Sequence, residues 1–147
     1  MDAEAVAWDA AHLPGRYVRL DADPPTPLPA SHFDVVYAGS VFTHFDEERQ
    51  LRWLTELHRI LRPGGLLIAS SHAPSLSAFR PDLAPEDRER LLSRGFLFAP
   101  GSGPFSEDSA FHSSDYLVKT WGKLFGLQAY RQFALNAYQD LAAWKKW

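Results

Sequence analysis

The stretch FDVVYAGSVFTHFDEERQLRWLTELHRILRPGGLLIASS, Phe33 to Ser71, carries the clearest structural pattern in this chain. Its first apolar run, Phe33–Ala38, is typical of a strand buried on both faces. A helical pattern follows, and Leu66–Ser70 reads as a second strand. Because the connections are short, this strand–helix–strand order predicts a parallel pair with a right-handed crossover.

The helix between the two strands has recognisable ends. Asp46 is a suitable N-cap residue, and Glu47 and Glu48 follow where the helix dipole favours negative charge. Leucines then recur at helical spacing as far as Leu61, and the run Pro63-Gly64-Gly65 stops the pattern. We interpret the leucine stripe as core packing.

The rest of the chain predicts a single domain spanning residues 1–147. The proline-rich stretch 21–32 and most of 72–109 are expected to be irregular, with APGSGPFSEDS (residues 99–109) as a surface loop or lid. The other expected elements are a helix at Ala3–His12, a strand at Arg16–Leu20, a helix starting at Pro85, a helix capped by Ser113 or Ser114 and closed by Gly126, and two antiparallel strands joined near residues 134–136.

Composition narrows the functional classes. The 147 residues are 46% hydrophobic and 22% charged with a formal net charge of -3, which gives no electrostatic reason to expect nucleic acid or an anionic membrane as partner. The chain has no cysteine, so disulfides, thiolate metal sites and a cysteine nucleophile are excluded. It has neither a secretory signal pattern nor a membrane-spanning apolar run, and we expect a cytoplasmic location.

The loop GSVFTH, which leaves the carboxyl end of the first strand, is the main candidate site. Ligands of open α/β sheets bind outside the carboxyl ends of the strands. Gly39 permits close backbone approach, and Ser40 and Thr43 carry hydroxyl groups. Phe42 is suited to stacking on a flat ring, and His44 to exchanging a proton near neutral pH. Either Asp21 or Asp23, after the expected strand 16–20, could accept hydrogen bonds from an amine or a hydroxyl. These groups suit a nucleoside.

Other kinds of site find less support. The six histidines show no ligand-like spacing with Asp or Glu, so we expect no metal site. A hydrolase triad around Ser40 lacks the G-x-S-x-G elbow. His72, after the second strand, either faces an acceptor or lies on the surface. Trp121, Trp144 and Trp147 are interpreted as packing or interface residues.

The segments LDADPP…LPASHFDVVYAGSVFTHF and WLTELHRILRPGGLLIAS resemble the class I S-adenosylmethionine-dependent methyltransferases. The resemblance makes FDVV the fourth strand of the family sheet and L-R-P-G-G the entry to the fifth. The closing segment, Phe111 to Lys145, is similar to the last helix and the final strand hairpin. The implied fold is α/β and Rossmann-like, with a mostly parallel sheet and a C-terminal antiparallel strand.

The resemblance also implies an activity, methyl transfer from S-adenosylmethionine to a small or medium acceptor. His44 is the candidate catalytic residue. The expected cofactor-binding residues flank the adenine or line the pocket for S-adenosylmethionine: Asp21, Ala22, Asp23, Gly39, Ser40, Val41 and Phe42.

The sequence departs from the family pattern at its beginning. It has neither the glycine-rich G-x-G-x-G turn after a first strand nor the acidic residue after a second strand. We therefore expect an N-terminally truncated domain without the first βαβ segment. Strand 16–20 would lose its neighbour, which predicts a marginally stable chain, a homo-oligomer or a partner chain that completes the sheet. The alternative function is a non-catalytic remnant or fragment acting as a structural or interaction module.

Overall fold

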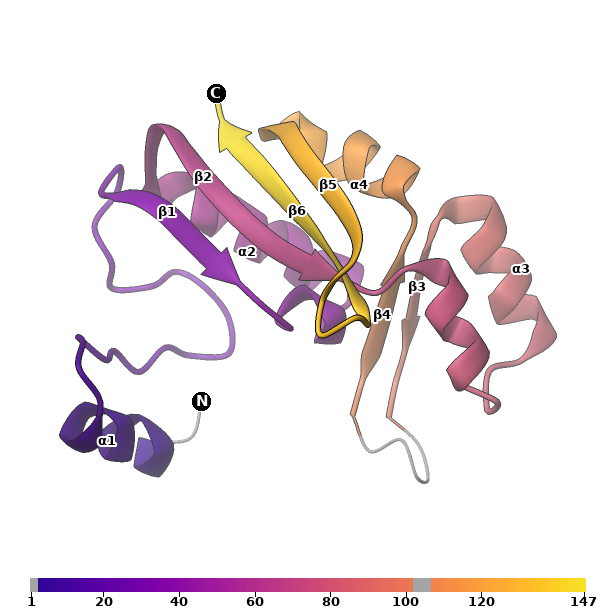
Figure 1. Ribbon diagram of the computed structural model, residues 1–147, viewed down its shortest axis with the longest axis horizontal. Coiled ribbons are helices and arrows are strands. Elements are labelled where there is room, and N and C mark those ends of the chain that lie inside the picture. The colour runs from indigo at the N-terminus through magenta and orange to yellow at the C-terminus, as the bar shows by residue number, and fades with distance from the viewer. Residues whose placement is uncertain (1–2, 102–106) are drawn as a thin grey trace.

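The computed structural model describes residues 3–101 and 107–147, and two sheets organise them (Figure 1). The larger sheet has the strand order β1-β2-β6-β5, and β3 and β4 form a separate hairpin. The elements are α1 (Ala3–His12), β1 (Phe33–Ala38), the 3-10 helix η1 (Phe42–His44), α2 (Glu47–Ile60), β2 (Leu61–Ser71), the 3-10 helix η2 (Pro74–Phe79), α3 (Pro85–Arg94), β3 (Phe96–Ala99), β4 (Ser109–His112), α4 (Ser114–Thr120), the 3-10 helix η3 (Trp121–Lys123), β5 (Phe125–Leu135) and β6 (Gln139–Lys146).

The larger sheet contains one parallel pairing. β1 and β2 run parallel, with Val36 opposite Leu67, as the crossover through α2 requires. β6 inserts between β2 and β5 and pairs antiparallel with both. The α/β Rossmann-like prediction is thus confirmed, but the expectation of a mostly parallel sheet is wrong. The described strands include one crossover pair, and the C-terminal hairpin supplies the antiparallel pairings.

Helices α2 and α4 pack on one face of this sheet and enclose the main core. The core includes Leu54 and Leu57 of α2, Leu67 of β2, and the fully or almost fully buried Trp121 and Trp144. The opposite face of the sheet, toward the viewer in Figure 1, has no helix against it in the described part of the chain. Val35 and Tyr37 of β1 point to that face and are 50% and 60% exposed, so the expectation of a strand buried on both faces is wrong.

The first end of α2 follows the sequence prediction, but Pro63-Gly64-Gly65, which was expected to stop the helix, lies inside β2, and α2 already ends at Ile60. Asp46 is the N-cap, and its carboxylate accepts a hydrogen bond from the Arg49 backbone nitrogen at 2.7 Å. At the other end, the ammonium group of Lys146 donates to the carbonyl oxygens of His58 and Leu61 at 2.6 and 2.7 Å. This lysine satisfies carbonyl groups that the helix terminus leaves without partners.

Two further predictions fail for identifiable reasons. Residues 16–20 form no strand: the chain crosses this region as an irregular segment and pairs neither with the open outer edge of β1 nor with another described strand, because a strand needs a pairing partner that the local sequence pattern does not supply. Gly126 does not close a helix but lies inside β5, since α4 ends at Thr120 and continues as η3. Ser113 does cap α4, accepting a hydrogen bond from the Tyr116 nitrogen.

The segment between β2 and α4 is more regular than its sequence indicates. It forms η2, α3 and the β3–β4 hairpin, which pack around a second small core of Leu76, Leu91, Leu97, Ala99 and Phe111. The β3–β4 hairpin was not predicted, and the expected loop or lid at residues 99–109 lies partly outside the described residues. This segment extends beyond the carboxyl ends of β1 and β2 (Figure 1).

Candidate functional site

The loop after β1 turns sharply and is tied to the neighbouring strands. Ser40 has a positive φ of 55°. Its backbone nitrogen donates to the Ser70 hydroxyl at 2.7 Å, and its hydroxyl accepts from the Gln139 side-chain nitrogen at 2.9 Å. The Ser70 hydroxyl in turn donates to the Gln139 side-chain oxygen at 2.6 Å. Ser40 therefore fixes the loop to β2 and β6, and its polar groups are already engaged within the protein.

Gly39, at the start of this loop, lies under the ring of Tyr37. A Cβ atom built on Gly39 would be 2.4 Å from the Tyr37 hydroxyl oxygen, closer than side chains pack. The sequence analysis expected Gly39 to let a ligand approach the backbone closely. In the fold, the Tyr37 side chain of the same chain occupies this space. A ligand that approached Gly39 from this side would have to displace the exposed Tyr37 ring.

An apolar pocket of about 630 Å³ lies beside β1 and α2, large enough for a small-molecule ligand. It brings together four of the predicted residues: Asp21 and Ala22 from the segment before β1, and Val41 and Phe42 from the loop after it. Asp23, Gly39 and Ser40 do not line it. The other lining residues are Leu20, Thr26, Leu28, Phe33, Val35, Val36, Tyr37, Ala38, Phe45, Arg49, Trp53, Leu57 and Ile60.

Phe42 contributes to this pocket differently from what its sequence position suggested. Its side chain is fully buried and packs against Trp121, with ring centroids 4.6 Å apart. It therefore forms part of the solid wall, whereas Val41 beside it is 39% exposed. Thr43 is also fully buried, and its hydroxyl has no hydrogen-bond partner in the described residues.

Asp23 serves as an anchor for the segment that carries Asp21 and Ala22. Its carboxylate contacts Arg52 at 2.9 Å and Arg49 at 3.2 Å. The hydrogen bond from Arg52 is the main cause that lowers the pKa of Asp23. The indole nitrogen of Trp53 donates to the Ala22 carbonyl oxygen at 3.1 Å. With Asp23 so engaged, Asp21 is left as the carboxylate at the pocket rim without a hydrogen-bond partner among the described residues.

Glu56 holds the next part of the same segment. It is 5% exposed, and one carboxylate oxygen accepts from the Thr26 backbone nitrogen at 2.9 Å and the Thr26 hydroxyl at 2.6 Å. Arg59 donates to both carboxylate oxygens, at 2.6 and 2.8 Å. The Arg59 hydrogen bonds, joined by those from Thr26, lower the pKa of Glu56 to about 2. This buried carboxylate thus fixes the pocket wall at Thr26 and Leu28 to α2.

His44 lies at the end of η1 with one ring nitrogen already oriented. Its Nδ1 atom is 2.7 Å from the backbone carbonyl oxygen of Asp108. A carbonyl oxygen accepts hydrogen bonds and cannot donate them, so Nδ1 carries the hydrogen. The lone pair of the neutral imidazole is then on Nε2. This is the arrangement of a proton acceptor held in one tautomer, as general bases require.

His72 and His112 are both buried, whereas the sequence analysis expected His72 either to face an acceptor or to lie on the surface. His72 is 6% exposed, between the rings of Phe111 and Tyr138, and burial is the main cause that lowers its pKa to about 4. His112 is fully buried, with Nε2 3.0 Å from the Gln50 side-chain oxygen and a pKa lowered by burial to about 3. Both are therefore neutral at pH 7 and pack as uncharged rings.

The described residues provide neither a metal site nor a membrane-spanning helix. No group of three His, Cys, Asp or Glu residues in that part of the chain is arranged to hold a metal ion. No helix there is long and apolar enough to cross a bilayer. Most anchoring residues of the pocket, Glu56 above all, escaped the sequence analysis, because a glutamate on a leucine-rich helix carries no signal of its burial.

Comparison with known proteins places this geometry in context. A protein-family model described as a methyltransferase domain matches residues 1–69. Among solved structures, an S-adenosylmethionine-dependent methyltransferase from Methanosarcina mazei has 16% identity and a TM-score of 0.70, with 99% of this chain and 78% of that chain covered. A second, from Mesorhizobium loti, has 18% identity and a TM-score of 0.69, with 99% and 77% covered.

A third structure contains bound ligands. The 1,6-didemethyltoxoflavin-N1-methyltransferase of Burkholderia thailandensis, with bound 1,6-didemethyltoxoflavin and S-adenosylhomocysteine, has 12% identity and a TM-score of 0.57, with 80% of this chain and 45% of that chain covered. At these identities the structural matches establish a shared fold.

Proposed function

We propose that this chain, whose residues 1–69 match a methyltransferase-domain family model and whose fold is shared with S-adenosylmethionine-dependent methyltransferases, transfers a methyl group from S-adenosylmethionine to a small or medium acceptor. The observation that carries the proposal is the apolar pocket. It joins Asp21 and Ala22 to Val41 and Phe42, two segments far apart in sequence that the family resemblance assigns to the same ligand.

The pocket suits the adenine part of S-adenosylmethionine. Its apolar walls provide surfaces for a flat ring, and Asp21 at the rim can accept a hydrogen bond from an exocyclic amine or a hydroxyl. For the charged methionine part, the pocket offers few polar lining residues, chiefly Asp21, Thr26 and Arg49. We therefore expect the nucleoside part to contribute most of the affinity.

The chemistry divides between the ligand and the chain. Bound S-adenosylmethionine supplies a methyl group activated by its sulfonium sulfur. The chain holds the acceptor in line with this methyl group, a positioning effect that accounts for much of catalysis in two-substrate reactions. His44 accepts the acceptor's proton on Nε2, and the carbonyl of Asp108 steadies the imidazole through Nδ1.

Isothermal titration with S-adenosylmethionine and S-adenosylhomocysteine tests donor binding. We expect micromolar dissociation constants for the folded chain and roughly tenfold weaker binding for Asp21→Asn, which loses a charged hydrogen-bond acceptor. Asp9→Asn on the exposed helix α1 is the matched control and should bind like the parent chain. Absence of heat at millimolar ligand would contradict the proposal.

His44→Gln tests the proton acceptor once an acceptor molecule has been found by screening for S-adenosylhomocysteine release. Loss of a general base lowers the turnover number by about 10²–10⁴, while donor affinity should stay unchanged. Equal turnover in the variant would assign His44 a structural role, with catalysis resting on positioning alone.

A second candidate function is supported by the open edge of β1. This strand has no partner on its outer side in the described residues, and Val35 and Tyr37 leave the adjoining sheet face exposed. Such an edge can accept another strand, so a structural or interaction module without catalysis is the competing proposal. Light scattering after size exclusion, over a range of concentrations, measures the oligomeric state; together with the donor titration it separates a monomer that binds the donor from an oligomer that does not.

A further inference from the structure

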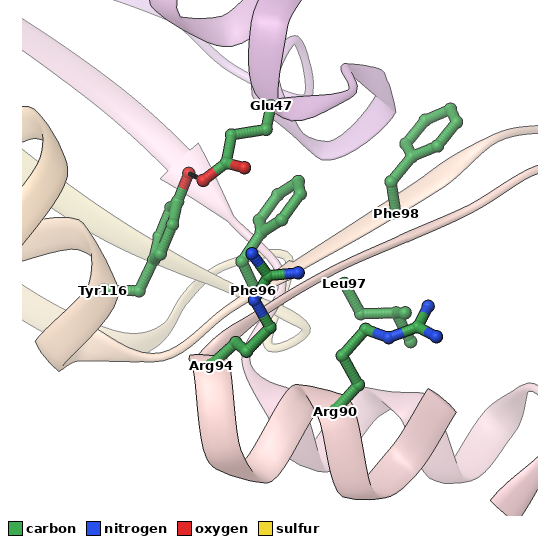
Figure 2. Close-up of a pocket in the computed structure, with 7 residues that line it drawn as sticks. All are labelled: Glu47, Arg90, Arg94, Phe96, Leu97, Phe98 and Tyr116. Atoms are coloured by element: carbon green, nitrogen blue, oxygen red, sulfur yellow. Dashed lines mark hydrogen bonds between the residues drawn. The ribbon is translucent and has the colours of Figure 1, made fainter. Parts of the chain in front are cut away.

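A second cleft, separate from the apolar pocket, lies between α3, β3 and the first turns of α2 and α4 (Figure 2). Its volume is about 470 Å³, within the range of small-molecule sites. It shares no lining residue with the apolar pocket and includes none of the residues to which the proposed methyl transfer assigns a role. The question is what its particular side chains would bind.

Two arginines of α3 form one side of the cleft. Arg90 and Arg94 are four residues apart, so they lie on the same helix face, and Figure 2 shows both side chains rising from α3 toward β3. Arg94 has no hydrogen-bond or ion-pair partner among the described residues. Arg90 contacts Asp87 at 3.2 Å, in a solvent-exposed pair of the kind that contributes little. Both guanidinium groups therefore remain available to an anion.

Aromatic rings form the wall between these arginines and α4. Phe96 and Phe98 alternate along β3 with Leu97, which packs in the second small core. The Phe96 ring stacks on Tyr116, with centroids 5.0 Å apart and an angle of 22° between the planes. This arrangement presents flat apolar surfaces next to two cationic groups, as a ligand with an aromatic ring and an acidic group requires.

A carboxylate on the far side limits the charge of that ligand. Glu47, in the first turn of α2, accepts a hydrogen bond from the Tyr116 hydroxyl at 2.9 Å. Burial, reinforced by this hydrogen bond, raises the pKa of Tyr116, so the hydroxyl keeps its proton at neutral pH. Because Glu47 is negatively charged and faces the same cleft, it disfavours a dianion more than a monoanion.

We propose that this cleft is a binding site for a small aromatic carboxylate. The guanidinium groups of Arg90 and Arg94 hold the carboxylate, for which their planar geometry is suited, and the ring lies against Phe96 and Phe98. The proposal does not depend on the methyltransferase assignment, because it concerns different residues and a different ligand.

Titration of the isotope-labelled chain with benzoate, followed by nuclear magnetic resonance, tests the site directly. We expect the largest shifts at the backbone amides of Gly95 to Phe98 and at Tyr116, and at least about tenfold weaker binding of benzamide, which has the same shape without the charge. Equal binding of benzamide, or shifts centred on the apolar pocket, would overturn the proposal.

Matched variants locate the charge requirement. Arg90→Gln with Arg94→Gln should weaken benzoate binding at least about tenfold, whereas Lys119→Gln with Arg131→Gln, which removes the same charge from exposed positions elsewhere, should leave it unchanged. Melting curves establish that both double variants fold. Binding of S-adenosylmethionine should be the same in both, so failure here is distinguishable from failure of the proposed function.

The role of Glu47 has its own test. Benzoate should bind more tightly than phenyl phosphate to the parent chain, and Glu47→Gln should narrow or abolish this preference. A preference unaffected by Glu47→Gln would show that the carboxylate does not face the ligand, and the proposed selection of monoanions would be wrong.

Discussion

Replacing Glu56 by glutamine should destabilise the protein in a pH-dependent way. The carboxylate is 5% exposed and accepts hydrogen bonds from Thr26 and Arg59. These bonds lower its pKa from 4.5 to about 2. A shift of this size corresponds to about 3 kcal/mol of folding free energy at neutral pH. Glutamine keeps the shape of the side chain but loses the charge, so Glu56→Gln should lose a stability of this order.

The pH window follows from the direction of the shift. Because the pKa of Glu56 is lower in the folded state, its contribution is complete above the unfolded value of 4.5 and is lost as the pH falls toward about 2. Urea unfolding of the parent chain and Glu56→Gln at pH 7, 5, 4 and 3 measures the difference in unfolding free energy. That difference should be largest at pH 7 and 5 and shrink at pH 4 and 3.

A control on the same helix separates burial from charge. Glu48 pairs with Arg52 at the surface and its side chain is 83% exposed, so Glu48→Gln should change stability by less than about 1 kcal/mol. A difference for Glu56→Gln that stays constant from pH 7 to pH 3, or that matches the Glu48 control, would refute the reasoning. The chain from Thr26 to Leu28 would then be held by something other than this carboxylate.

Three further predictions concern particular contacts. Trp53→Phe removes the hydrogen bond to the Ala22 carbonyl and should cost about 1 kcal/mol of stability. It should also weaken binding of S-adenosylmethionine several-fold, as measured by titration calorimetry. Unchanged affinity would show that the position of Ala22 does not matter for the ligand. Gly95→Ala should lower the free energy of urea unfolding by about 2 kcal/mol or more. Gly95 has a φ of 75°, and a Cβ atom there would be 2.3 Å from the Ser113 hydroxyl that caps α4. An unchanged unfolding free energy would contradict this clash. Lys146→Met leaves the carbonyl groups of His58 and Leu61 without their donor and should cost about 2 kcal/mol, with Lys145→Met as the exposed control.

The sequence predicts the elements whose causes are local. The strand Phe33–Ala38, the N-cap at Asp46 and the helix beginning at Pro85 are all confirmed, because each follows from residues within a few positions of one another. The strand expected at residues 16–20 is wrong, since a strand needs a partner that no local pattern guarantees. The β3–β4 hairpin was missed for a similar reason: its short strands are stabilised by packing against α3 and η2.

Site prediction has the same limit. Ala22, Val41 and Asp21, which the family resemblance assigns to one ligand, do line a common pocket, and their role in cofactor binding stays a prediction. The residues that hold the pocket in shape were not predicted, since the burial of Glu56 and the double ion pair of Asp23 arise from packing across α2. Ser40 shows the converse, because a hydroxyl that looks available in the sequence is already bonded to Gln139 in the fold.

The segment from Gly39 to Glu47 links the two candidate binding sites. Its first part, at Val41 and Phe42, lines the apolar pocket, and its last residue, Glu47, faces the arginine cleft. Between them, His44 is held by the carbonyl of Asp108, whose carboxylate also accepts from the Gly101 backbone nitrogen at 2.9 Å. Movement of the β3–β4 hairpin would therefore act on the His44 ring directly, because Asp108 immediately precedes β4.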